Sequence, residues 1–137
     1  TYMRVAHRCL RDNGLFLVHT IGNNTSSRIG DPWMDKYIFP DGMLPSPAHI
    51  TRAIYGLFVL EDWHNFGTHY DRTLMAWHEN FSHNWERIRT NPKYDERFRR
   101  MWTYYLLSCA GSFRARNNQV WQIVLSRGFP RGYESER

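Results

Sequence analysis

Cysteine is scarce in this 137-residue sequence, which contains only Cys9 and Cys109. Two cysteines exclude a disulfide framework, and their separation is not that of a metal-binding pair. The sequence also lacks any apolar run close to the roughly 20 residues that cross a bilayer, and no secretory leader pattern opens it. We therefore expect a cytoplasmic protein without a membrane-spanning segment.

The composition is typical of one folded domain, because 42% of the residues are hydrophobic. Aromatic residues are abundant at 16%, and basic residues outnumber acidic ones by 18 to 13. The resulting net charge of +5 favours an acidic partner or an anionic lipid surface.

The first part of the sequence alternates helical and strand patterns. Apolar spacing predicts a helix over residues 2–10, and the continuous apolar run 15–21 predicts a strand covered on both faces. Residues 22–33 are rich in Asn, Ser and Gly and predict a loop. Segment 46–55 opens with Ser-Pro, which predicts a capped helix with proline at its first position.

The second part predicts a buried strand over residues 57–62, two long amphipathic helices over 70–88 and 98–113, and a last strand over 120–126. The whole order is typical of an α/β protein with a helical insertion before the final strand. Three strands leave the 15–21 strand with a hydrophobic edge unless another strand pairs with it. The chain therefore reads as the second half of a larger sheet.

One histidine stands out at the end of the first strand. His19 follows the apolar run that begins after Gly14, and Gly22 comes soon after it. Ligands of open α/β sheets gather beyond the carboxyl ends of the strands. His19 is therefore a candidate functional residue, although a satisfied structural histidine is the alternative.

Motifs along nearly the whole chain, from Tyr2 to Arg127, add to this pattern. They are His19–Gly22, Asp31–Trp33, Lys36–Pro40 with Gly42 and Leu44–Ser46, Glu61–Phe66, Tyr70 with Thr73–Trp77, and Cys109–Arg116. In this order they resemble the C-terminal region of cyclopropane-fatty-acyl-phospholipid synthases and, in part, of their mycolic-acid relatives.

The resemblance implies a Rossmann-like class I methyltransferase that uses S-adenosylmethionine. The three strands would be the last three of its sheet, with a two-helix insertion before the final antiparallel strand. Residues 1–127 would be the C-terminal part of the catalytic domain, and 128–137 a polar tail. The glycine-rich cofactor loop would lie in an N-terminal half, since no GxGxxG-like loop is found here. We therefore expect the isolated chain to bind the cofactor poorly and to be inactive.

The implied reaction transfers a methylene group to a cis double bond of an unsaturated phospholipid acyl chain. Relatives that resemble this chain hold bicarbonate as the base. Its ligands map onto the His19 side chain, the Ile21 main chain and the Tyr70 hydroxyl, with a Cys and a Glu from the other half. Imidazole and phenol groups can hydrogen-bond a small oxyanion and orient it, which agrees with this assignment.

Further positions have two interpretations each. The resemblance gives Cys109 as an active-site residue, whereas its place on an apolar helix stripe favours burial, with lining of the acyl pocket as its role. Trp33, Tyr37 and Phe39 are candidates to bind the acyl chain, or they form a plain hydrophobic cover. Glu61 can orient a neighbour or be a solvated carboxylate.

Other functions fit less well. His78 and His83 are one residue too far apart for an HExxH motif, so we expect no metal. Nucleic-acid binding is disfavoured because most aromatics fall on apolar stripes. A lipid methyltransferase that leaves a methyl branch, or a non-catalytic lipid-binding or dimerisation fragment, are the alternatives. We expect a peripheral protein on the anionic inner face of the membrane, and a homodimer is possible.

Overall fold

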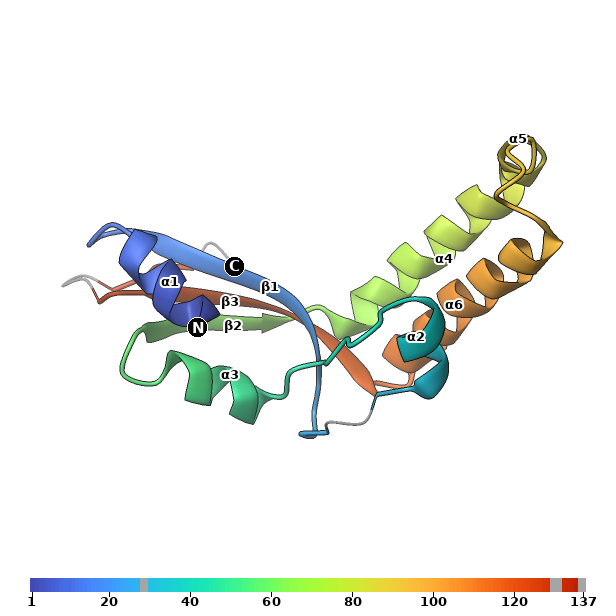
Figure 1. The fold of residues 1–137 in the computed structure, drawn as a ribbon. Coiled ribbons are helices and arrows are strands. Elements are labelled where there is room, and N and C mark those ends of the chain that lie inside the picture. Colours follow the sequence, from blue (N-terminus) through green and yellow to red (C-terminus); the bar gives the residue numbers. More distant parts are fainter. Residues whose placement is uncertain (28–29, 129–131, 136–137) are drawn as a thin grey trace. The chain divides into compact units, whose positions relative to one another are not determined.

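The computed structural model describes residues 1–27, 30–128 and 132–135. The described chain forms two compact units by its internal contacts. The sheet unit comprises Thr1–Arg28, Leu44–Phe66 and Gln119–Arg137, and the helical unit comprises Ile29–Met43 and Gly67–Asn118. In chain order the elements are α1 (Tyr2–Cys9), β1 (Leu15–Asn23), α2 (Pro32–Tyr37), α3 (Pro47–Ile54), β2 (Val59–Asn65), α4 (Gly67–His83), α5 (Trp85–Ile88), α6 (Glu96–Arg114) and β3 (Asn118–Ser126) (Figure 1).

The sheet has three strands in the order β1-β3-β2, so the last strand of the chain lies between the other two. β3 runs antiparallel to β2, with Val59 opposite Ser126 at one end and Asn65 opposite Trp121 at the other. The register shifts once, between Leu60 and Asp62. The predicted α/β class and the antiparallel final strand are confirmed.

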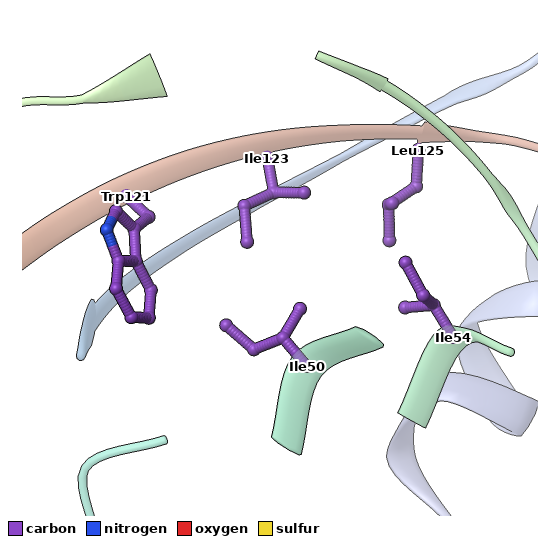
Figure 2. Close-up of a cluster of buried hydrophobic side chains, with 5 residues drawn as sticks. All are labelled: Ile50, Ile54, Trp121, Ile123 and Leu125. Carbon is purple, nitrogen blue, oxygen red and sulfur yellow. The ribbon is translucent and has the colours of Figure 1, made fainter. Parts of the chain in front are cut away.

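The core of the sheet unit lies between α3 and one face of the sheet. Ile50 and Ile54 are one helical turn apart and point toward Trp121, Ile123 and Leu125 of β3 (Figure 2). The three β3 residues alternate along the strand and therefore share a face. Partly buried side chains surround this cluster: Met3, Phe16, Val18, Phe58 and Trp63.

The expectation that β1 is covered on both faces is wrong for the described chain. Phe16 and Val18 pack against the core, whereas Leu15 and Leu17 are 47% and 54% exposed. Met3 of α1 joins the same core as α3, so both helices cover one face. An apolar run in a sequence does not show whether one or both faces of a strand are covered. The alternation of exposed and partly buried residues along β1 shows that one face is covered.

Helix starts follow local capping signals. The Ser46 hydroxyl accepts from the His49 N–H (3.2 Å), and the Ser46 N–H donates to His49 Nδ1 (3.3 Å). This capping box, with Pro47 at the first position, confirms the predicted start of α3.

The predicted loop over residues 22–33 is wrong at both ends, because β1 continues to Asn23 and α2 begins at Pro32. The Asp31 carboxylate accepts from the N–H groups of Trp33 and Met34, each at 2.9 Å, and Pro32 takes the first helical position. The Asp-Pro pair was a readable helix start. Residues 28 and 29 of that loop lie outside the described chain.

In the helical unit, α4 and α6 lie side by side (Figure 1). The predicted long helix over 98–113 is confirmed within α6, whose buried stripe includes Leu106, Ala110 and Phe113. The other predicted helix, 70–88, is interrupted at Asn84, so the insertion contains the short α5 as a third helix. The Asn84 side chain donates a hydrogen bond to the Asn80 carbonyl (2.8 Å). Side-chain hydrogen bonds of this kind compete with the backbone hydrogen bonds of a helix.

Near the predicted polar tail, Arg127 is anchored to the sheet unit. Its guanidinium lies 3.0 Å from the Asp12 carboxylate and donates to the Leu10 carbonyl (3.1 Å). Residues 132–135 form no helix or strand, and 129–131 and 136–137 lie outside the described chain.

Candidate functional site

The prediction that His19 ends the first strand is wrong, because β1 continues to Asn23 and His19 is its middle residue. It lies on the sheet face opposite to the helices α1 and α3. Side chains alternate along β1, which places His19 on the same face as Leu15 and Leu17. Its Nδ1 is 3.3 Å from the Gln122 amide nitrogen on the neighbouring strand β3. The imidazole is exposed, so its second nitrogen is available to a ligand. Sequence reasoning missed Gln122, although it is a single polar residue within the apolar run of β3.

The backbone after His19 is held by close packing. The Thr20 hydroxyl donates to the Ile21 carbonyl (2.9 Å), and Gly22 is buried beneath the indole of Trp121. A Cβ on Gly22 would lie only 2.1 Å from that ring, so glycine is required by a close approach. The main chain of Ile21, a predicted ligand, therefore lies within β1 directly before a tightly packed glycine.

On β2, Glu61 accepts a hydrogen bond from the fully buried Ser126 hydroxyl. Ser126 Oγ also accepts from the Gly128 N–H (2.9 Å). Glu61 therefore does orient a neighbour, and the neighbour it holds is the end of β3. The same strand carries His64, opposite Gln122 in the ladder, with its ring centroid 3.9 Å from that of Phe66.

Tyr70 lies in the first turns of α4 and is fixed by ring contacts within the helical unit. Its ring centroid is 5.0 Å from Phe113 and 5.9 Å from Trp77, both in edge-on geometry. The next residue, Asp71, accepts two hydrogen bonds of 2.9 Å from the guanidinium of Arg114. This bidentate pair fastens the start of α4 to the end of α6 beside the phenol.

Two of the three predicted substrate-binding aromatics, Trp33 and Phe39, contact α6, and Tyr37 contacts Trp33. Trp33 lies 4.5 Å from Tyr104 and 5.4 Å from Tyr37, and Phe39 lies 5.9 Å from Tyr105, between ring centroids. Sequence reasoning missed Tyr104 and Tyr105. The many aromatic residues of the segment 98–113 were evident in the sequence. Their contact with α2 could not be predicted, because that segment was expected to be a loop.

Cys109 and the tyrosines share an electrostatic environment. Burial raises the pKa of the Cys109 thiol to about 11, and the charge of Asp31 contributes to this increase. Burial also raises the pKa of Tyr105, with smaller contributions from Cys109 and Tyr70. Tyr105 is thus close enough to both Cys109 and Tyr70 for each to affect it. A thiol with this pKa stays protonated at neutral pH, which disfavours a nucleophilic role.

This environment predicts slow alkylation of Cys109. With a pKa of about 11, only ~0.1% of the thiol is ionised at pH 8, so iodoacetamide should modify it at least about 100-fold more slowly than an ordinary exposed thiol. Mass spectrometry of timed reactions would measure this, with the exposed Cys9 as the internal control. The Cys109 rate should rise about tenfold per pH unit. Equal rates for both cysteines at pH 8 would contradict the protected environment.

No group of three His, Cys, Asp or Glu side chains within the described residues is arranged to hold a metal ion. Among the helices of residues 1–27, 30–128 and 132–135, none has the length and apolar character to cross a bilayer.

Comparison with known proteins agrees with the fold and the motifs. The mycolic acid cyclopropane synthetase family matches residues 1–123. Cyclopropane-fatty-acyl-phospholipid synthase of Escherichia coli K12 is 53% identical over all 137 residues, which correspond to 35% of that protein. Tuberculostearic acid methyltransferase UfaA1 of Mycobacterium tuberculosis is 35% identical over 108 residues, 77% of this chain and 25% of the relative.

A solved structure supports the same conclusion. The cyclopropane synthase MmaA2 from Mycobacterium tuberculosis superimposes with a TM-score of 0.79 at 25% identity, covering 90% of this chain and 48% of the other. The chain therefore spans between a quarter and a half of the length of these proteins. It belongs to the mycolic acid cyclopropane synthetase family.

Proposed function

We propose that this chain is the C-terminal part of an S-adenosylmethionine-dependent catalytic domain that converts a cis double bond of a phospholipid acyl chain into a cyclopropane ring. The observation that carries the proposal is the 53% identity to the Escherichia coli synthase across every residue of the chain. Because the chain spans 35% of that relative, the activity belongs to the complete protein. The isolated chain is proposed to be inactive.

The residue types available suit a small oxyanion. His19 has one ring nitrogen engaged by Gln122 and leaves the other to a ligand, and the Tyr70 ring is held by Phe113 and Trp77. Both side chains can donate hydrogen bonds to an anion without bringing a competing negative charge. His19, the Ile21 main chain and Tyr70 are proposed to hold bicarbonate. When bound, bicarbonate supplies the base that removes a proton during ring closure.

The aromatic side chains of the helical unit suit the acyl substrate. Trp33 packs with Tyr37 and Tyr104, and Phe39 packs with Tyr105. Aromatic faces attract positive charge, and methylation of an alkene places positive charge on the acyl chain. These residues are proposed to bind the chain and stabilise that charge, with the protonated Cys109 beside them.

The membrane partner is proposed from exposed basic residues on α6. Arg97, Arg99 and Arg100 are exposed near the start of this helix. Arg99 has a partner in Glu96 at 3.7 Å, and exposed pairs of this kind are weak. These guanidinium groups suit anionic headgroups, and the complete protein is proposed to be peripheral to a membrane.

A methyl-branching reaction is the second candidate. The 35% identity to a tuberculostearic acid methyltransferase favours it, since the same methyl transfer followed by a different fate of the cation gives a branched product. Retention of His19 and Tyr70 favours ring closure.

A labelled donor separates the two reactions. The complete protein would be incubated with S-adenosylmethionine that carries a deuterated methyl group and with vesicles of an unsaturated phospholipid. Ring closure should give a cyclopropane acyl chain that has lost one deuterium of the transferred methyl. A branched acyl chain would support the second candidate, and absence of transfer to any acyl chain would contradict both.

A further inference from the structure

Gln122 lies on the sheet face opposite to α1 and α3, where it is half-buried between the buried Val120 and Val124 of the same strand. It belongs to the middle strand β3, where Trp121 and Ile123 on either side point into the core. On one side, its amide nitrogen is 3.3 Å from His19 Nδ1. On the other, it pairs in register with His64 of β2. The amide therefore separates two imidazoles on one face of the sheet.

The chemistry of this contact determines where the imidazole proton lies. An amide nitrogen carries two donor hydrogens and cannot accept. With the amide nitrogen of Gln122 toward His19, as in this structure, Nδ1 accepts, and in the neutral ring the proton is then on Nε2. A neutral His19 held in this state presents a hydrogen-bond donor, rather than a lone pair, to any ligand at Nε2.

We propose that Gln122 is a positioning residue that keeps His19 in its Nε2–H tautomer and thereby makes it a permanent donor to an anion. This inference rests on the proposed function, in which His19 holds an oxyanion. In the opposite tautomer, the Nε2 lone pair would face the negative charge of that anion and repel it.

Other ionisable groups on this face do not replace Gln122. His64 stands in register with Gln122, and its ring packs on Phe66 at 3.9 Å. Asp62 is opposite Val124, one ladder position further along the same face. β3 lies between their strand and β1, so the contact with His19 Nδ1 is made by Gln122.

Two substitutions of similar size test the proposal in the complete protein. Gln122→Met removes the donor, so His19 exchanges freely between tautomers and kcat/KM should fall only a few-fold. Gln122→Glu replaces the donor with an acceptor, which draws the proton to Nδ1. Neutral His19 then loses its Nε2 donor, and kcat/KM should fall by at least about tenfold at alkaline pH, since the wrong tautomer is a severe defect in catalytic histidines.

The pH profile separates positioning from packing. At lower pH the imidazolium has protons on both nitrogens, so Gln122→Glu should recover most of its activity there, whereas the parent protein should show no such recovery. Loss of fold would lower activity at every pH. Selective ¹⁵N labelling of histidine gives a second readout, because the two nitrogens of His19 should exchange their protonated and unprotonated shifts in Gln122→Glu.

Three outcomes would overturn the inference: a pH-independent loss in Gln122→Glu, a larger loss in Gln122→Met than in Gln122→Glu at alkaline pH, or an Nδ1–H tautomer in the parent protein. The variant His19→Ala shows whether such a result disproves only the role of Gln122 or also the proposed anion site. If His19→Ala is strongly impaired while Gln122→Glu behaves like the parent, only the role of Gln122 is wrong. If His19→Ala is fully active, the proposed anion site itself is wrong.

Discussion

Replacing His19 with alanine is expected to lower product formation by the complete protein roughly 100- to 1,000-fold, the range typical for loss of one fixed hydrogen-bond donor to an anion in an active site. The imidazole is exposed on the sheet face opposite to α1 and α3 and takes no part in the core cluster, so its removal should leave the fold intact. Binding of S-adenosylmethionine should also persist, because His19 is proposed to hold the anion and not the donor. Turnover of unsaturated phospholipid and donor titration would measure the two effects.

Tyr70→Phe is the companion substitution for the helical unit. It removes only the hydroxyl, so the ring contacts with Phe113 and Trp77 remain. We expect a loss of roughly tenfold or more in turnover, with unchanged thermal stability. His83→Ala, an exposed histidine at the end of α4, is the matched control and should be fully active. Unchanged turnover in both His19→Ala and Tyr70→Phe would remove these residues from the reaction.

Local signals in the sequence were sufficient for some elements of this fold. The start of α3 is determined by Ser46, Pro47 and His49, which interact within one turn, so their pattern could be read directly. The apolar stripe of α6 was equally clear, because a helix presents residues three and four apart on one side. Both elements depend on contacts between residues that are close in the sequence.

Other features depend on residues far apart in the sequence and could not be read in this way. The exposure of Leu15 and Leu17 depends on where α1 and α3 pack, which the apolar run itself does not encode. The contact of His19 with Gln122 joins residues separated by 103 positions and required the order of the strands.

The candidate site shows the same division. The resemblance to a family identified His19, Tyr70 and Cys109 as candidate site residues. The contacts around them depend on tertiary packing and were not predicted. The raised pKa of Cys109 follows from burial beside Asp31, a residue that the missed helix α2 places there. Whether the thiol reacts is therefore a question of tertiary structure, which the sequence pattern around Cys109 left open.

A large loss of stability is expected from Gly22→Ala. An added Cβ would lie 2.1 Å from the Trp121 ring, far inside van der Waals contact. The indole cannot easily move, because it is 3% exposed and packs edge-on against Trp63 at 5.1 Å. Overpacking usually costs ~1–3 kcal/mol, and we expect about 3 kcal/mol or more here because the neighbour is a rigid, enclosed ring. Urea unfolding would measure the change in the free energy of unfolding.

A second substitution tests the cause of this loss. Trp121→Leu alone should be destabilising by roughly 2–5 kcal/mol, because it leaves a cavity against Ile50 and Ile54. In the double variant the new methyl group occupies part of that cavity. The double variant should therefore lose less stability than the sum of the two single losses, by about 1 kcal/mol or more. Simple additivity would mean that the indole is not what requires glycine at position 22. Since Gly22 directly follows Ile21, relief of the clash should also restore the part of β1 that presents His19 to its ligand.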